Sequence, residues 1–156
     1  MKDDIALLQH AIDLAKEGIS NGRGPFGAVV SRNGDIISEA SNIVVITHDP
    51  TAHAEVMAIR KASEKLQTHN LSDCVIYASC EPCPMCLGAI YWAGIRRVVY
   101  AAERDDAGKA GFSDSFIYDE IALNPSERKI SFCHVSLKEG KEVFRLWDEY
   151  ENKVRY

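Results

Sequence analysis

Two short pieces of the sequence carry side chains that bind a transition metal and move protons. The first supplies His53 and Glu55, two positions apart, and the second supplies Cys83 and Cys86, three positions apart. Catalytic zinc typically has three nitrogen, sulfur or oxygen ligands from the protein and an open fourth position for water. The pattern predicts one zinc ion held by His53, Cys83 and Cys86. Glu55 remains beside the water, where a carboxylate acts as general acid and base.

Two helix starts must position these groups. Pro84 directly follows Cys83, and proline is favoured at the first position of a helix, so both thiols fall in a first helical turn. The helix dipole and free amide hydrogens there favour the thiolate, which is the form that binds zinc. His53 and Glu55 would diverge on the flank of a helix. Their spacing therefore fits a site that faces the amino end of a second helix.

Other interpretations of the same thiols remain open. A CxxC pair is also typical of redox proteins, although that leaves the upstream His53 and Glu55 unexplained. Cys80, Cys83 and Cys86 imitate the beginning of an iron–sulfur motif, but position 90 is Ile and no further Cys-Pro follows. A structural zinc site would take Cys80 as a fourth ligand and would not need a free carboxylate. We interpret the remaining cysteines as structural: Cys74, Cys80 and Cys133.

The composition is that of one globular domain covering residues 1–156. Hydrophobic residues make up 46% of the chain and charged residues 26%, which is typical of such a domain. The first four residues include two acids where a secretory signal has basic residues, and the longest apolar stretch, residues 87–95, is too short for a membrane span. We expect a cytoplasmic protein with reduced thiols. The net charge of −5 argues against a general nucleic-acid binder.

Hydrophobic periodicity and turn residues predict strands that alternate with helices. The expected helices cover residues 3–20, a segment starting at Asp49-Pro50-Thr51, and residues 84–94, 115–123 and 138–152. The expected strands are 26–31 and 35–40, joined by Asn33-Gly34 as a hairpin, then 75–79, 97–102 and 129–135. This alternation predicts an α/β fold with one mixed sheet between layers of helices.

Longer motifs around these residues resemble one enzyme superfamily. H-x-E followed by P-C-x-x-C resembles the signature of the zinc-dependent cytidine and deoxycytidylate deaminases. Four segments resemble the branch with bacterial guanine deaminases and tRNA adenosine deaminases: Asp49–Glu55, Glu81–Cys86, Pro25–Val29 and Arg96–Tyr100. The resemblance runs from residue 20 to about residue 115. It implies a three-layer α/β/α fold with a five-stranded sheet, one zinc per chain, and a homodimer.

Within that branch, the chain resembles the guanine enzymes more than the RNA enzymes. The segment Ala110–Asp114 and the acidic tail are similar to the former, whereas the RNA enzymes usually have Val where Phe26 stands. The resemblance implies a hydrolase of purine catabolism that converts guanine, a small nucleobase, to xanthine and ammonia. The alternatives are a tRNA adenosine deaminase, a cytosine or cytidine deaminase, and a non-catalytic zinc or redox module.

Several residues are candidates for contact with the base. Asn42 resembles the family position whose amide bonds the substrate, but asparagine is also common in turns. Asp114 would accept hydrogen bonds from the N–H groups of guanine, or would cap the helix that follows it. Phe26 and Trp92 are suited to stacking on the base or to packing in the core. Ala54, between His53 and Glu55, completes this set of candidates.

The end of the chain is a candidate lid. The last expected helix carries four large apolar residues: Val143, Phe144, Trp147 and Tyr150. Tyr156 follows this helix. Chemistry on a small base benefits from a cover that excludes bulk water. We therefore expect Tyr156 to close a zinc pocket, either its own or that of a partner subunit. The alternative is a helix that only packs on the sheet.

Overall fold

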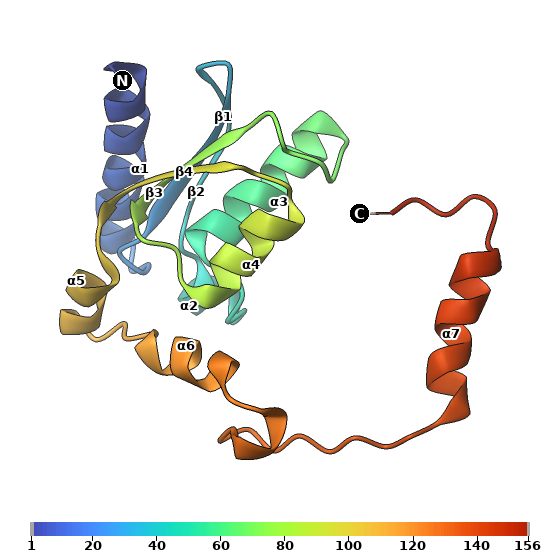
Figure 1. The fold of residues 1–156 in the computed structure, drawn as a ribbon. Helices are drawn as coiled ribbons and strands as arrows, with labels where there is room; N and C mark the ends of the chain where they lie inside the picture. Colours follow the sequence, from blue (N-terminus) through green and yellow to red (C-terminus); the bar gives the residue numbers. More distant parts are fainter. Residues whose placement is uncertain (1, 156) are drawn as a thin grey trace. The chain divides into compact units, whose positions relative to one another are not determined.

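The computed structural model describes residues 2–155, with side chains from residue 4 onward. The chain forms two compact units, Met1–Phe116 and Ile117–Tyr156. The first unit contains the β-sheet and the helices that pack on it (Figure 1). Among the described residues, no helix has the length and apolar character that crossing a membrane requires.

The sheet of the first unit has four strands in the order β2-β1-β3-β4. They are β1 (Gly27–Arg32), β2 (Asp35–Ser41), β3 (Val75–Cys80) and β4 (Arg97–Ala102). β1 pairs antiparallel with both β2 and β3, while β3 and β4 are parallel. The predicted mixed sheet is confirmed, but the fifth strand that the resemblance implied is not present among the described residues.

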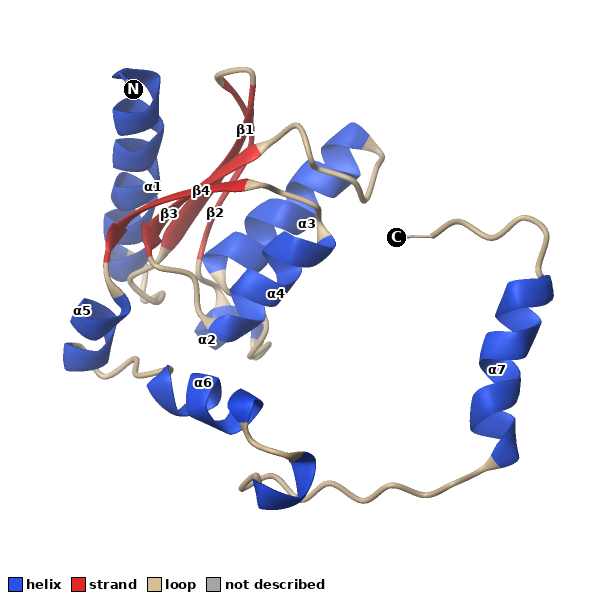
Figure 2. Cartoon of the chain, viewed as in Figure 1, coloured by secondary structure: helices blue, strands red, loops and turns tan. Residues whose placement is uncertain are grey.

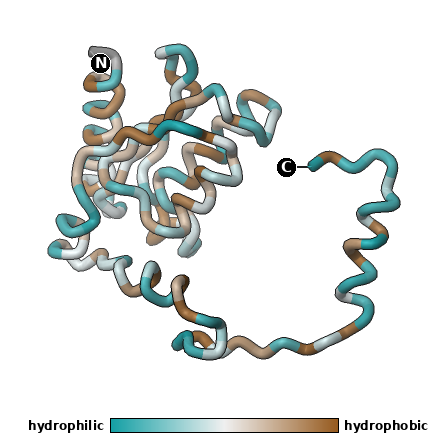
Figure 3. Tube along the Cα trace, in the orientation of Figure 1, coloured by the Kyte–Doolittle hydropathy of each residue, from teal (hydrophilic) through white to brown (hydrophobic). Residues whose placement is uncertain are grey.

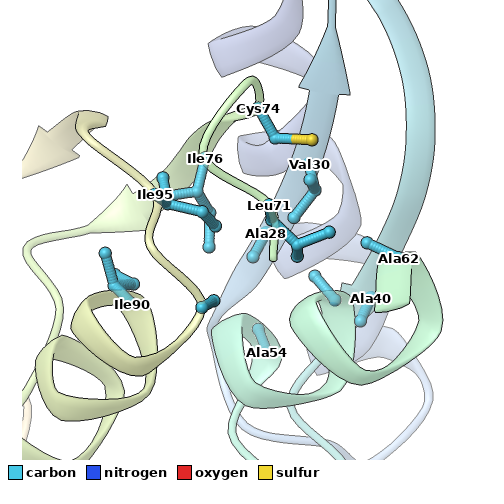
Figure 4. Packing of buried hydrophobic residues seen from close by; sticks show 12 residues of the cluster. Ala28, Val30, Ala40, Ala54, Ala62, Leu71, Cys74, Ile76, Ile90 and Ile95 are labelled. Atoms are coloured by element: carbon cyan, nitrogen blue, oxygen red, sulfur yellow. The ribbon is translucent and has the colours of Figure 1, made fainter. Parts of the chain in front are cut away.

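Helices cover both faces of this sheet (Figure 2). α1 (Lys2–Ser20) packs on one face, where its residues Leu7 and Ala11 meet Val29 and Tyr77 of the sheet. α3 (Ala54–Leu66) and α4 (Pro84–Trp92) pack on the other face. Figure 4 shows the second core, in which small alanines of α3 let the helix approach the strands closely. Its labelled members are Ala28, Val30, Ala40, Ala54, Ala62, Leu71, Cys74, Ile76, Ile90 and Ile95.

The beginning of β1 lies at the same edge of the sheet as the carboxyl ends of the other three strands. This follows because β1 is antiparallel to both β2 and β3, and β4 is parallel to β3. Gly27 pairs with Ser41 in the ladder, and its backbone N donates a hydrogen bond to Ser79 Oγ at 3.0 Å. Cys80 pairs with Ala102 at the same edge. Loops that leave this edge therefore converge on the starts of α3 and α4.

The predicted helix start at Asp49 and Pro50 is wrong. Asp49 Oδ1 accepts hydrogen bonds from the Thr51 backbone N at 2.8 Å and from Thr51 Oγ1 at 2.7 Å. This local turn satisfies the carboxylate before any helix begins. α3 starts later, at Ala54, after His53 in the N-cap position. Because α3 starts later than predicted, His53 is its N-cap residue and Glu55 lies in its first turn.

Two short helices of the first unit were not predicted. They are α2 (Val44–Thr47) and α5 (Arg104–Lys109). α5 is short and mostly charged, and an apolar period cannot reveal such a helix. Its start is stabilised by Asp106, whose Oδ2 accepts a hydrogen bond from the Glu103 backbone N at 3.2 Å.

The second unit consists of helices and irregular segments. α6 (Ser115–Ala122) enters it, and η1 (Pro125–Glu127) and α7 (Lys138–Glu149) follow. The strand predicted at residues 129–135 does not form, and its apolar residues Ile130 and Phe132 are exposed. A strand needs a neighbour for its backbone hydrogen bonds, and the described part of this unit contains no other strand.

α7 is a markedly two-sided helix. Apolar and polar residues alternate along it (Figure 3), and Phe144 is 72% exposed. On the polar side, Arg145 forms ion pairs with Glu142 and Glu149. The helix ends at Glu149, three residues before the predicted end. Its apolar side is thus available for contact with other protein surface.

Candidate active site

Three side chains predicted as metal ligands lie together at the starts of two helices. His53 is the N-cap residue of α3, and Cys83 is the N-cap residue of α4, where Pro84 follows at the first position. His53 Nδ1 lies 3.5 Å from Cys83 Sγ and 3.5 Å from Cys86 Sγ. The two sulfur atoms are also 3.5 Å apart. The predicted convergence of two helix starts is confirmed.

This triangle fits a zinc ion. Tetrahedral zinc with Zn–S near 2.3 Å and Zn–N near 2.0 Å separates its ligand atoms by about 3.5 to 3.8 Å. The three observed separations agree with that spacing. Among the described residues, His53, Cys83 and Cys86 are the group of potential ligands close enough to share one ion. Three ligands leave a fourth position, as in catalytic sites.

The charges of the site also fit a cation. The contacts with the Cys86 and His53 side chains lower the pKa of Cys83 to about 4, which favours its thiolate form. The same thiolate raises the pKa of Cys86, as does burial. The hydrogen bond to Cys83 raises the pKa of His53. A divalent ion would stabilise the second thiolate, which the buried thiol pair alone cannot form.

Glu55 lies against this cluster inside the protein. Its residue is 6% exposed, and its Oε2 accepts a hydrogen bond from Cys86 Sγ at 3.5 Å. Burial raises the pKa of the Glu55 carboxyl, and the negative charge of Cys83 adds to the effect. A carboxyl group with a raised pKa, next to a metal position, is suited to accepting and returning a proton.

Cys80 lies near the cluster but outside it. Its thiol donates a hydrogen bond to the Glu103 backbone O at 3.6 Å and connects β3 to the segment that follows β4. Burial raises the pKa of Cys80 to about 11, so the thiol stays protonated. Its surroundings are those of a structural thiol, in agreement with the sequence interpretation.

Asn42 and Phe26 lie together at the sheet edge. The Asn42 backbone N donates to the Phe26 backbone O at 2.9 Å, and Asn42 Oδ1 accepts from the Val44 backbone N at 3.1 Å. Asn42 is therefore a turn residue, as one of its two interpretations stated. Its amide nitrogen donates to no other residue in the part of the chain that the structure describes. The Asn42 side chain thus keeps a donor for a ligand.

Asp114 lies within electrostatic range of the metal cluster. Partial burial raises the pKa of its carboxyl, the Cys83 thiolate raises it further, and Arg104 opposes the rise. Two residues earlier, the Phe112 ring meets the Phe26 ring edge-on, with centroids 5.1 Å apart and planes at 88°. The sequence did not single out Phe112. This contact joins the segment of Asp114 to the residues at the start of β1.

The remaining candidates differ in position. Ala54 is fully buried at the first position of α3, between His53 and Glu55. Trp92 is the last residue of α4, and its residue is 70% exposed. The structure does not bring it to the cluster, because the nine-residue helix separates it from Cys83. Tyr156 lies outside the described residues.

Comparisons with known proteins agree with this geometry. The family model for the cytidine and deoxycytidylate deaminase zinc-binding region matches residues 1–102. The chain is 54% identical over 150 residues to a guanine deaminase of Bacillus subtilis, covering 96% of each protein. It is 36% identical to a tRNA-specific adenosine deaminase of Aquifex aeolicus, covering 95% of this chain and 93% of that protein.

A solved structure shares the fold. The X-ray structure of guanine deaminase from Bacillus subtilis aligns with a TM-score of 0.94 at 53% identity, covering 97% of each chain. The family model includes every residue of the cluster, His53, Cys83 and Cys86, together with Glu55. The chain therefore belongs to the cytidine and deoxycytidylate deaminase family of zinc-binding enzymes.

Proposed function

We propose that this enzyme hydrolyses guanine to xanthine and ammonia. The observation that carries the proposal is the buried carboxyl of Glu55 against a three-ligand metal cluster. The choice of guanine is supported by the 54% identity to a guanine deaminase over nearly the whole of both chains. That coverage also supports one deaminase domain over residues 1–156. The free cysteines support a cytoplasmic location.

Glu55 is the proton carrier in this proposal. Zinc held by His53, Cys83 and Cys86 would supply a Lewis acid that acidifies a water molecule. Glu55 accepts one proton from the water while the water oxygen bonds to C2 of guanine. Glu55 then delivers this proton to N3. It then carries the second proton to the amine, so that the C2–N bond breaks and ammonia leaves. The products, xanthine and ammonia, balance guanine and water.

Base recognition is assigned to residues of the sheet edge and the loop before α6. Asp114 accepts hydrogen bonds from guanine N–H groups, which a carboxylate does well because it has no donor of its own. Adenine presents an unprotonated ring nitrogen where guanine has N1–H. This nitrogen is an acceptor and would face another acceptor, the carboxylate of Asp114. Asn42 offers its amide N–H groups to an acceptor atom, and Phe26 stacks on the ring. Ala54, between the metal ligand and the proton carrier, is the remaining residue assigned to the base.

The substrate assignment is tested by ammonia release from guanine, adenine, cytosine, cytidine and a tRNA anticodon stem-loop, side by side. We expect guanine to have the highest kcat/KM. In the Asp114→Asn variant, loss of a charged hydrogen-bond acceptor should lower kcat/KM for guanine about 10- to 100-fold, equivalent to about 1.5–3 kcal/mol. Replacing the exposed Asp119 by Asn is the matched control. Conversion of the stem-loop without guanine turnover would identify a tRNA deaminase instead.

We also propose a homodimer in which the carboxyl-terminal segment covers a zinc pocket. The support is the apolar side of α7, on which Phe144 is 72% exposed and Trp147 is 39% exposed. In the first unit, Trp92 and Tyr91 of α4 are also exposed. Exposed large apolar side chains on neighbouring positions of a helix are a feature of subunit contacts. In such a dimer Trp92 contacts the base from a neighbouring subunit.

Deleting residues 153–156 tests the cover. The deletion spares α7, which ends at Glu149. A covering role for Tyr156 predicts that guanine turnover falls at least about tenfold, because bulk water enters the site and the ring is held less firmly. Zinc content and thermal midpoint should stay unchanged, and sedimentation should give the same oligomer. Full turnover by the shortened enzyme would rule out the cover.

A further inference from the structure

The side chain of Asn42 lies directly on the backbone of Gly24. A Cβ atom added at Gly24 would lie 3.0 Å from Asn42 Cγ and 3.1 Å from Asn42 Oδ1. Carbon atoms at ordinary contact are about 3.5–4.0 Å apart, so a side chain here would press on the amide, which would have to move by a few tenths of an ångström. Gly24 is not among the glycines with positive φ. Glycine is therefore needed at this position for space, not for backbone conformation.

Asn42 has little freedom to move away. Its residue is 7% exposed, and its Oδ1 is held by the Val44 backbone N at 3.1 Å. Its own backbone N is held by the Phe26 backbone O at 2.9 Å. A methyl group at residue 24 would therefore rotate the amide or lengthen the bond to Val44. Either change reorients the amide nitrogen.

We propose that Gly24 is a positioning residue for base recognition. Because Gly24 has no side chain, the Asn42 amide can keep one orientation. In this orientation its oxygen accepts a hydrogen bond from the Val44 backbone N, and its N–H groups are left for the substrate. The substrate atom that Asn42 meets is then an acceptor, either a carbonyl oxygen or an unprotonated ring nitrogen. The inference rests on the proposed contact between Asn42 and the base.

The Gly24→Ala variant tests this role. We expect KM for guanine to rise about tenfold, the size of one misplaced hydrogen bond, while kcat changes less. Zinc content and thermal midpoint should match the wild type. Gly108→Ala is the matched control, because a Cβ atom at Gly108 would meet nothing within 4 Å. It should leave both kinetic constants unchanged.

A double-mutant cycle shows whether Gly24 acts through Asn42. In an Asn42→Ala background, where the amide is absent, Gly24→Ala should have no further effect on KM. Additive effects in the cycle, or a wild-type KM for Gly24→Ala alone, would overturn the proposal. The cycle is measured with whichever base the wild type converts. A wild type that ignores guanine thus contradicts the proposed substrate, whereas additivity contradicts the role of Gly24.

Discussion

Replacing Glu55 by Gln is expected to lower kcat for guanine at least about 100-fold, the usual contribution of a positioned general acid and base. Glutamine has nearly the same shape but cannot accept a proton from water and return it. The side chain is buried against Cys86, so the amide should keep the packing of the site. Zinc should remain at one ion per chain, measured by metal analysis of the purified variant.

The control for this experiment is Glu64→Gln. Glu64 is an exposed acid near the other end of the same helix, α3. The control should keep wild-type turnover. If Glu55 only stabilised the first turn of α3, its replacement would lower the thermal midpoint and leave kcat nearly unchanged. Near-normal turnover in a zinc-loaded Glu55→Gln enzyme would remove Glu55 from the mechanism.

Replacing Cys83 by Ala should remove zinc and, with it, deamination. Only His53 and Cys86 would remain, and two ligands hold zinc far more weakly than three. We expect zinc well below one ion per chain after dialysis, and ammonia release near background. Far-UV circular dichroism should show that the sheet and helices persist, because Cys83 precedes α4 and lies outside the core cluster.

The Cys80→Ala variant tests whether this neighbouring thiol is a zinc ligand. Cys80 donates to the Glu103 backbone O and lies outside the metal cluster, so its loss should lower the thermal midpoint slightly and spare the zinc. Retention of zinc by the Cys83 variant, with loss from the Cys80 variant, would show that the ligands are assigned wrongly.

The elements that the sequence predicted well are those with local causes. Asn33 and Gly34 both have positive φ, 54° and 90°, which is what a two-residue hairpin turn demands. Pro84 begins α4 because its fixed φ suits a first helical position and its missing N–H costs nothing there. The two thiol ligands were predictable for the same reason, because Cys83 and Cys86 belong to the helix start that Pro84 marks. His53 was predicted from its spacing to Glu55, since the start of its own helix was placed too early.

The errors concern features that depend on distant partners. Residues 129–135 have the alternation of a strand, but alternation cannot supply the neighbouring strand that its backbone needs. Asp49 has the residue type of a helix cap, yet its carboxylate is engaged by Thr51 in a turn. The strand failed for lack of a partner, whereas at Asp49 a competing interaction decided the structure.

The contacts around the proposed base site could be predicted only in part, for a similar reason. The edge-on contact of Phe112 with Phe26 joins residues far apart in the sequence, and no local pattern announces it. The space at Gly24 depends on Asn42, which arrives from the end of a different strand. The contact between Gly24 and Asn42 follows from the pairing of β1 with β2, which brings the beginning of β1 beside the end of β2.

The meeting of strand ends at one edge also has an evolutionary consequence. The metal ligands and Glu55 come from the starts of α3 and α4, whereas Gly24 and Phe26 precede β1 and Asn42 follows β2. Since these are separate stretches of chain, substitutions beside the hairpin should alter the proposed base contacts while leaving the zinc ligands in place. Selection can thus diversify the substrate while the catalytic machinery is inherited intact. We expect enzymes of this family with different substrates to differ most in the loop before α6, which contains Asp114.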